Sequence, residues 1–187
     1  MKKIILTAIA LLGASVMFAQ KTGEILSTIE KNGGKVLSGS FVEVRTPAPT
    51  SGAKAVTLTG DLIFKPQNFL SMMYDNKDLF SIDGNTMVIS QNGANQTFDL
   101  TKNLMMRSLS NTLLYALNGV LIKLTAEQDA DISAVRNGSD YVVTLTARKK
   151  AVRGYCKITA VYKASDCSLH KMTMDEFSGA STSYSLK

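Results

Sequence analysis

Short runs in which apolar and polar residues alternate make up most of this chain. They cover residues 40–46, 56–65, 69–75, 78–83, 86–91, 96–100, 131–136, 141–149, 155–163, 169–177 and 181–187. A period of two is typical of a strand that buries one face, and the Asp-Gly, Asn-Gly and Ser-Asp dipeptides between the runs are typical of hairpin turns. The pattern therefore predicts an antiparallel sheet of about ten or eleven strands.

The segment LMMRSLSNTLLYALNGVLIKL at residues 104–124 has helical spacing instead. One half of its helical wheel is apolar, yet Leu104, Tyr115 and Ile122 add apolar surface to the other half. A helix that buries only one face has no reason to carry apolar residues on the other. We therefore expect Leu104, Tyr115 and Ile122 to pack against the opening helix or a partner. Because the dipeptide Asn118-Gly119 favours a helix end, we predict two short helices, near 102–117 and 120–125.

A sheet of this size has to curl or close, because open twisted sheets seldom exceed about ten strands. An opening helix is expected where Ile25, Leu26 and Ile29 have helical spacing, before Gly33. This order of elements excludes a parallel α/β enzyme. We predict a mainly β (α+β) fold, a half-open antiparallel β-barrel of about 10–11 strands with a helical lid over an apolar cavity.

The first 19 residues have the pattern of a cleaved signal peptide. Lys2 and Lys3 precede an apolar run from Ile4 to Gly13, and a candidate cleavage site follows Ala19. The run is too short for a stable membrane span, and no cysteine follows it for lipid attachment. We expect residues 20–187 to form a single exported, soluble domain.

The charge of that domain is mildly positive. Removing residues 1–19 leaves 19 Lys and Arg against 15 Asp and Glu, a net charge of +4. The one basic cluster is ARKKAVR at 147–153, and a nucleic-acid footprint would need a denser stripe with interleaved aromatic residues. We therefore expect no nucleic-acid partner. Attraction to an anionic membrane surface fits this charge better.

Two cysteines in an exported protein invite a disulfide, but the predicted register separates them. If the hairpin turn centres near Ser165-Asp166, Cys156 lies opposite a residue near Asp175, roughly 25–30 Å from Cys167 along the strands. A disulfide needs Cα atoms within about 7 Å. Either both thiols are free or the turn lies elsewhere.

The sequence carries no recognisable catalytic or metal-binding motif. Its one histidine, His170, lies within an alternating run, and the Gly-x-Ser-x-Gly, His-Glu-x-x-His and Cys-x-x-Cys patterns are missing. Asp75, Asp78 and Asp83 lie at turns, which Asp favours for backbone reasons, and they lack calcium-loop spacing. We predict that the protein is not an enzyme and that it uses no metal or cofactor.

The methionines give a stronger indication of the kind of site than the histidine and the aspartates do. Seven of the nine methionines fall on predicted strands or on the central helix: Met72, Met73, Met87, Met105, Met106, Met172 and Met174. Methionine is flexible and polarizable, so it packs against surfaces of more than one shape. Any one of them can simply fill an irregular core. Together with a sheet that must curl, they favour a deformable apolar cavity.

Residues 58–89, LTGDLIFKPQNFLSMMYDNKDLFSIDGNTMVI, resemble the signature of the LolA-like periplasmic carriers of outer-membrane lipoproteins. In that family a strand ending Gly-x-Leu-x-x-(Lys/Arg)-Pro precedes an aromatic-bearing strand and an Asp-Gly turn. Residues 171–186, KMTMDEFSGASTSYSL, resemble the family's closing hairpin. With the two helical segments, the resemblance spans residues 22–187.

The resemblance implies a soluble periplasmic carrier, which we expect to be a monomer, that holds the acyl chains of lipoproteins. It implies an inner-membrane lipoprotein export complex as donor and an outer-membrane lipoprotein acceptor. Lys65 falls at a position where the best-known members have an arginine that helps to keep the lid shut. Lysine lacks the planar fork of arginine, so Lys65 is a candidate lid latch that departs from the family's pattern.

We expect the cavity to draw on both sheet and helix, provided that even-numbered residues of run 56–65 face inward. Its predicted lining residues are Leu62, Phe64, Met72, Met106, Leu109, Leu113, Leu117, Met172 and Met174. Two alternatives stay open. One is a periplasmic binding protein for free lipids, or a lipoprotein-sensing module, on the same fold. The other is a structural or interaction protein of the cell envelope, in which the central helix is plain core.

Overall fold

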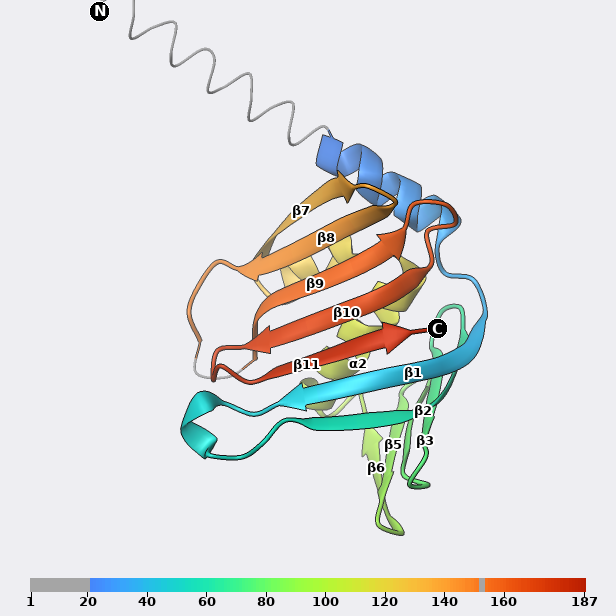
Figure 1. The fold of residues 1–187 in the computed structure, drawn as a ribbon, viewed down its shortest axis with the longest axis vertical. Helices are drawn as coiled ribbons and strands as arrows, with labels where there is room; N and C mark the ends of the chain where they lie inside the picture. Colours follow the sequence, from blue (N-terminus) through green and yellow to red (C-terminus); the bar gives the residue numbers. More distant parts are fainter. Residues whose placement is uncertain (1–20, 152–153) are drawn as a thin grey trace, which may run out of the picture.

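The computed structural model describes residues 21–151 and 154–187 (Figure 1), so the predicted signal peptide lies outside the described residues. Eleven strands form one antiparallel sheet in the order β6-β5-β4-β3-β2-β1-β11-β10-β9-β8-β7. They are β1 (Leu37–Thr46), β2 (Val56–Lys65), β3 (Phe69–Tyr74), β4 (Leu79–Asp83), β5 (Thr86–Gln91), β6 (Ala94–Asp99), β7 (Ala130–Asn137), β8 (Asp140–Ala147), β9 (Tyr155–Lys163), β10 (Leu169–Glu176) and β11 (Ser181–Leu186). The sheet is curled but not closed, which confirms the predicted half-open barrel.

Strands β1 and β11 lie side by side in the middle of the sheet and join its two halves (Figure 1). Their register places Phe41 opposite Leu186 and Glu43 opposite Tyr184. Strands β1 to β6 form one meander and β7 to β11 the other. Each strand within a meander pairs with its neighbour in the chain, as short hairpin turns require.

The helical lid follows β6 and consists of α2 (Leu104–Asn118), a 3₁₀ turn η2 (Leu121–Lys123) and α3 (Leu124–Glu127). Asn103 caps α2, because its side-chain oxygen accepts a hydrogen bond from the Met106 N–H at 3.1 Å. Gly119 ends the helix in the left-handed conformation, with φ of 74°. The predicted break after Asn118 is confirmed. In Figure 1, α2 lies behind β9 to β11, on the concave side of the sheet.

The opening helix, residues 21–32, runs beside the β7–β9 part of the sheet (Figure 1). The Thr22 hydroxyl donates to the carbonyl of Ala134 in β7 at 3.4 Å. Ile29 is buried against the end of α2, where a methyl group on Gly119 would lie 3.0 Å from Ile29 Cγ2. This helix therefore supports one end of the lid. A second short 3₁₀ turn, η1 (Pro49–Ser51), lies in the Pro-rich loop between β1 and β2.

Strand parity sets which side chains of β2 enter the interior. Leu62 and Phe64 are buried, whereas Ile63 between them is 44% exposed, so the predicted facing is confirmed. Gly60 lies on the same inner face, and a methyl group there would lie 2.1 Å from the Met73 carbonyl oxygen. The absence of a side chain at Gly60 thus allows β3 to approach β2 closely where the sheet bends.

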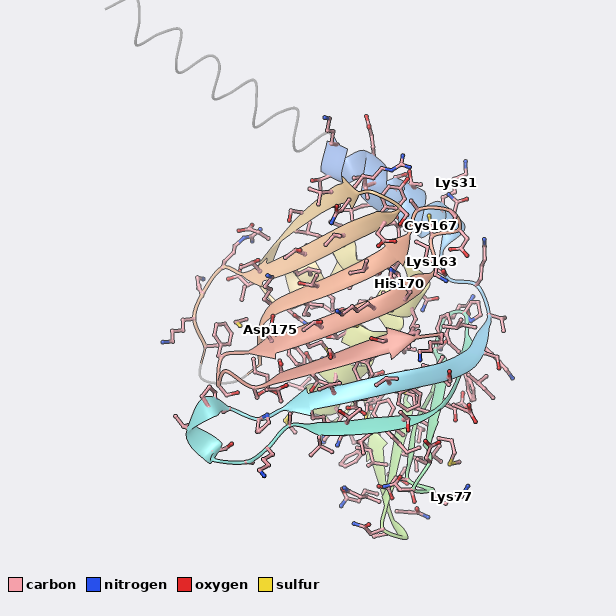
Figure 2. The ribbon with its side chains drawn as sticks, viewed as in Figure 1. Lys31, Lys77, Lys163, Cys167, His170 and Asp175 are labelled. Atoms are coloured by element: carbon pink, nitrogen blue, oxygen red, sulfur yellow. The ribbon has the colours of Figure 1, made fainter. Side chains whose placement is uncertain are left out.

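Both cysteines are free, as one of the two sequence interpretations required. The Cys156 thiol donates to the carbonyl of Asp175 at 3.3 Å, close to the partner that the predicted turn assigned to it. Cys167 lies near the other end of β10, beside the opening helix, and Figure 2 labels Asp175 and Cys167 at these two ends. The strand register therefore keeps the thiols apart.

Candidate functional site

Two wide cavities lie between the N-terminal half of α2 and the sheet. The first has a volume of about 550 Å³ and is lined by Met105, Met106 and Leu109 of α2 and by Tyr155 of β9. The second has a volume of about 590 Å³. Its wall includes Leu109 and Tyr155 as well, so the two cavities adjoin.

Part of the wall of the second cavity is apolar. Leu58, Phe80 and Ile89 reach it from β2, β4 and β5, and Met174 reaches it from β10. These strands belong to both meanders, so the cavity spans the middle of the curled sheet. Its size falls within the range of roughly 300–1,000 Å³ that is usual for small-molecule sites.

A third cavity, under the C-terminal half of α2, is almost completely filled. Five of the predicted lining residues surround it: Leu62, Met72, Leu113, Leu117 and Met172. Its volume is only about 20 Å³, little more than a single water molecule needs. The lid's own leucines therefore occupy the space that the sequence assigned to a ligand.

The other predicted lining residues lie in different places. Met106 and Leu109 line the first wide cavity, and Leu109 and Met174 line the second. Phe64 is fully buried in the core and lines none of the three cavities. The predicted residues thus divide between the filled interior and the open space beside it.

The side chain of Asn118 ties the end of α2 to the β2–β3 turn. Its Oδ1 accepts from the Gln67 N–H at 3.0 Å, and its Nδ2 donates to the Gln67 carbonyl at 3.0 Å. Gln67 has φ of 81°, which is uncommon for a residue other than glycine. The Tyr162 hydroxyl adds a third tie by donating to the carbonyl of Ala116 in α2 at 2.8 Å.

Lys65, the candidate latch, is oriented differently. Its ammonium nitrogen lies 5.1 Å from the centroid of the Phe69 ring, a cation–π geometry. Among residues 21–151 and 154–187, no hydrogen bond or ion pair joins Lys65 to α2. Side-chain hydrogen bonds from Asn118 and Tyr162 tie the end of α2 to the sheet instead.

A buried polar cluster also lines the second cavity, beside its apolar residues. Glu43 is 1% exposed, and its carboxylate accepts from Arg45 Nε at 2.6 Å and from Arg45 Nη2 at 3.2 Å. The hydroxyls of Tyr74 and Tyr184 donate to the same carboxylate at 2.6 and 3.2 Å. These four bonds fill the acceptor sites of the carboxylate.

The cluster fixes the charges of its members. Burial, and then the neighbouring Glu43 carboxylate, raise the pKa of Tyr74 and of Tyr184 above the ordinary tyrosine value. The hydrogen bond to Glu43 raises the pKa of Arg45. Both phenols are therefore neutral and the guanidinium is charged at neutral pH.

Sequence reasoning missed this cluster, although β1 contains its signal. Phe41, Glu43 and Arg45 are spaced two apart, and residues at that spacing share one face of a strand. Once Phe41 is assigned to the interior, the two charged residues follow it there.

The apolar residues on the far half of α2 and its extension remain accessible. Leu104 is 66% and Ile122 is 42% exposed. The opening helix therefore does not cover these two residues, although the sequence led us to expect that it or a partner would. Tyr115 donates to Glu127 at 3.0 Å, and the ammonium of Lys123 lies 5.6 Å from the centroid of its ring. Tyr115 thus binds α2 to the short helices that follow it.

The residues that the structure describes offer neither a metal site nor a membrane-spanning helix. No three His, Cys, Asp or Glu side chains there gather as a metal site requires. None of the helices in this part of the chain is long and apolar enough to cross a membrane.

The fold and its cavities define a class of protein: an open antiparallel half-barrel whose concave face holds a helix and wide cavities beside it. Solved structures of MucB (12% identical, TM-score 0.53) and of the Pseudomonas aeruginosa MucA/MucB complex (14% identical, TM-score 0.52) share this fold. Each match covers 89% of this chain, which spans only 57% and 55% of the length of the matched chains.

A LolA superfamily structure is also among those similar to this chain. LolA superfamily protein NE2245 from Nitrosomonas europaea is 13% identical, with 89% of this chain and 91% of that chain covered and a TM-score of 0.39. No protein-family model and no curated protein sequence matches the chain. At these identities the likeness to MucB shows the fold alone.

Proposed function

We propose that this protein is a periplasmic carrier that binds the acyl chains of lipoproteins and ferries them from the inner to the outer membrane. One observation carries the proposal: two adjoining cavities of about 550 and 590 Å³ lie between α2 and the concave face of the sheet. Leu109 lies between them and lines both. Apolar walls of this extent suit an acyl chain, which binds by burial rather than by directed bonds.

The energetics favour a carrier with a wall that can rearrange. Bringing acyl chain into water costs about 0.8 kcal/mol per CH₂, so a chain of about sixteen carbons costs roughly 12 kcal/mol. A site that recovered all of this would never release its cargo. Leu113 and Leu117 already fill the inner space without a ligand. A chain that displaces them exchanges one apolar contact for another, which keeps net affinity moderate.

The lid must also open at small cost. Two hydrogen bonds between Asn118 and Gln67 hold its end to the β2–β3 turn, and a typical hydrogen bond contributes about 0.5–1.5 kcal/mol net. Opening of this contact is thus within reach of thermal fluctuation. We propose Asn118, rather than Lys65 alone, as the lid latch.

The carrier role brings two partners with it. An inner-membrane lipoprotein export complex would supply the cargo, and an outer-membrane lipoprotein acceptor would receive it. The protein would act between them in the periplasm as a soluble monomer, after removal of residues 1–19. Met105, Met106 and Met174 line the two wide cavities and supply side chains that adapt to acyl chains of different shape.

A second candidate function is the binding of free lipids. The observation that favours it is the charged side chain of Arg45 in the wall of the second cavity, half exposed beside an apolar surface. A lipid with a small polar head would meet both surfaces at once.

The test is to incubate the purified protein with membranes that hold a labelled lipoprotein and to look for a soluble one-to-one complex. Leu109→Glu places a charge between both wide cavities and should abolish the complex. Ile63→Glu places the same charge on the outer face of β2, where Ile63 is exposed, and should leave the complex intact.

The outcomes separate the candidates. A soluble complex that Leu109→Glu alone abolishes supports the carrier. If no complex forms but free fatty acid binds, the protein is a general lipid binder. If neither binds, a structural or interaction role in the envelope takes the place of both.

A further inference from the structure

The guanidinium of Arg45 has one edge occupied and one edge free. Glu43 takes the edge formed by Nε and Nη2, at 2.6 and 3.2 Å. Within the described part of the chain, Nη1 has no hydrogen-bond partner, and Nη2 has one further contact, with the Tyr74 hydroxyl at 3.5 Å. The side chain is 50% exposed and lines the second cavity. Arg45 therefore brings unpaired Nη1 donors to the wall of the cavity where a ligand would lie.

Glu43 orients this free edge but does not itself compete for a ligand. Its carboxylate already accepts four hydrogen bonds, from Arg45, Tyr74 and Tyr184. A guanidinium held on two atoms loses little further freedom on binding, which reduces the entropic cost of a second partner. Arg45, held in place by the buried Glu43 carboxylate, is thus a preorganised donor.

The surroundings of Arg45 restrict the chemistry of that partner. Arg45 is the only Lys or Arg side chain among the described residues that line this cavity. Asp78 lies in the same wall, but its carboxylate accepts from the Asn92 N–H at 2.8 Å and from Asn76 Nδ2 at 2.9 Å. The free donors require oxygen acceptors, and the Nη1–Nη2 edge matches two oxygens of one carboxylate or phosphate.

The rest of the cavity is suited to a hydrocarbon chain. Leu58, Phe80, Ile89 and Met174 lie in the same wall as Arg45. A ligand that meets both parts needs an anionic head and an apolar tail. A chain with an uncharged head would leave the donors of Arg45 without an acceptor, and unsatisfied charged donors are costly in a partly buried site.

We propose that the second cavity binds a single-chain anionic amphiphile, with its carboxylate or phosphate on the free edge of Arg45 and its chain along the apolar wall. This inference rests on the proposed binding of acyl chains beneath α2. It adds a head-group site, formed by Arg45 and oriented by Glu43, that selects among molecules with the same chain.

The test compares three probes of equal chain length: dodecanoate, methyl dodecanoate and dodecyl phosphate. Each displaces an environment-sensitive apolar fluorophore from the purified protein, which gives its dissociation constant. We expect at least one anion to bind about tenfold or more tightly than the ester, as hydrogen bonds to a charged group allow. The carboxylate and phosphate arms show which head group is the better fit.

The variants are chosen so that no buried charge is left alone. Arg45→Gln by itself would strand the Glu43 carboxylate, which is strongly destabilising, so the double variant Glu43→Gln/Arg45→Gln removes both charges together. It should bind the ester as the wild type does and lose the preference for the anion. Glu43→Gln keeps the guanidinium and should retain the preference.

Two results would overturn the inference in different ways. If the ester binds as tightly as both anions, or if the double variant keeps the preference, the head-group site is wrong and the acyl cavity stands. If no probe binds the wild type, the acyl cavity is wrong and the head-group site falls with it.

Discussion

Replacing Asn118 by alanine tests whether the contact with the β2–β3 turn restrains the lid. The change removes two hydrogen bonds to Gln67, both 3.0 Å long. At about 1 kcal/mol each, their loss favours an open lid by about 2 kcal/mol. Because 1.4 kcal/mol is a factor of ten, the ratio of open to closed protein should rise by roughly 30-fold. The Asn118 bond to the carbonyl of Leu114, 2.8 Å long, lies within α2 and does not restrain the lid.

The assay measures ligand affinity and stability side by side. If a ligand enters only the open form, its apparent affinity rises with the open fraction, so Asn118→Ala should lower the Kd of a fluorescent acyl probe by up to about 30-fold. The free energy of unfolding, from denaturant titration, should fall by about 3 kcal/mol, because the bond to Leu114 is lost together with the two bonds to Gln67. Lys65→Ala is the control, because Lys65 contacts the ring of Phe69, and it should leave the Kd unchanged.

Two results would refute this reasoning. If Asn118→Ala loses stability but keeps the wild-type Kd, the residue only ends the helix, and opening at this contact does not limit binding. If Lys65→Ala tightens binding instead, the latch lies where the sequence resemblance placed it.

Three further predictions concern the sheet, the filled cavity and Tyr155. Gly60→Ala should lower the free energy of unfolding by about 3 kcal/mol, because its methyl group would lie 2.1 Å from the Met73 carbonyl oxygen and overpacking costs up to about that much. Gly23→Ala, in the opening helix with no atom of another segment within 4 Å, should not lower it, because alanine favours a helix over glycine by about 1 kcal/mol. Equal losses would contradict the close approach at Gly60. Leu113→Glu should abolish ligand uptake, since it introduces a charge among the leucines and methionines of the filled cavity; a folded variant with unchanged uptake would confine the ligand to the two wide cavities, which Leu113 does not line. Burial, and then the charge of Glu176, raise the pKa of Tyr155 to about 12, whereas an unfolded tyrosine ionises near 10. The stability that Tyr155 contributes is therefore full below pH 10 and lost as pH rises toward 12, so Tyr155→Phe should flatten the decline in unfolding free energy over that interval.

The elements of the fold were predictable because each carries its own local signal. Alternation located the eleven strands, and the dipeptide Asn118-Gly119 located the end of α2. The distance between Cys156 and Cys167 followed from the turn alone, since strand geometry is nearly constant. Burial of Leu62 and Phe64 followed from parity. In each case a short stretch of sequence determines the structural feature.

The features of the site depend on contacts between distant segments, which short patterns do not encode. The partner of Asn118 is the backbone of Gln67, so the identity of the residue at position 67 gives no hint of the contact. The volume left beneath the lid depends on how Leu113 and Leu117 fit against the sheet, and complementarity of that kind is a property of the folded structure. Charged residues such as Glu43 are ordinarily assigned to the solvent, and only the strand parity of β1 opposes that assignment.

The pairing of β1 with β11 has a consequence for the order of folding. This pairing brings together residues such as Glu43 and Tyr184, which are 141 positions apart in the sequence. A growing chain can form the β1–β6 meander early, but the backbone N–H and C=O groups along one side of β1 have no partner until the last strand is made. Exposed strand edges of this kind invite pairing with other chains, and contacts between distant residues form slowly. The newly made chain therefore passes through a stage in which the middle of its future sheet is an open edge, and its yield depends on how well that edge is protected until synthesis ends.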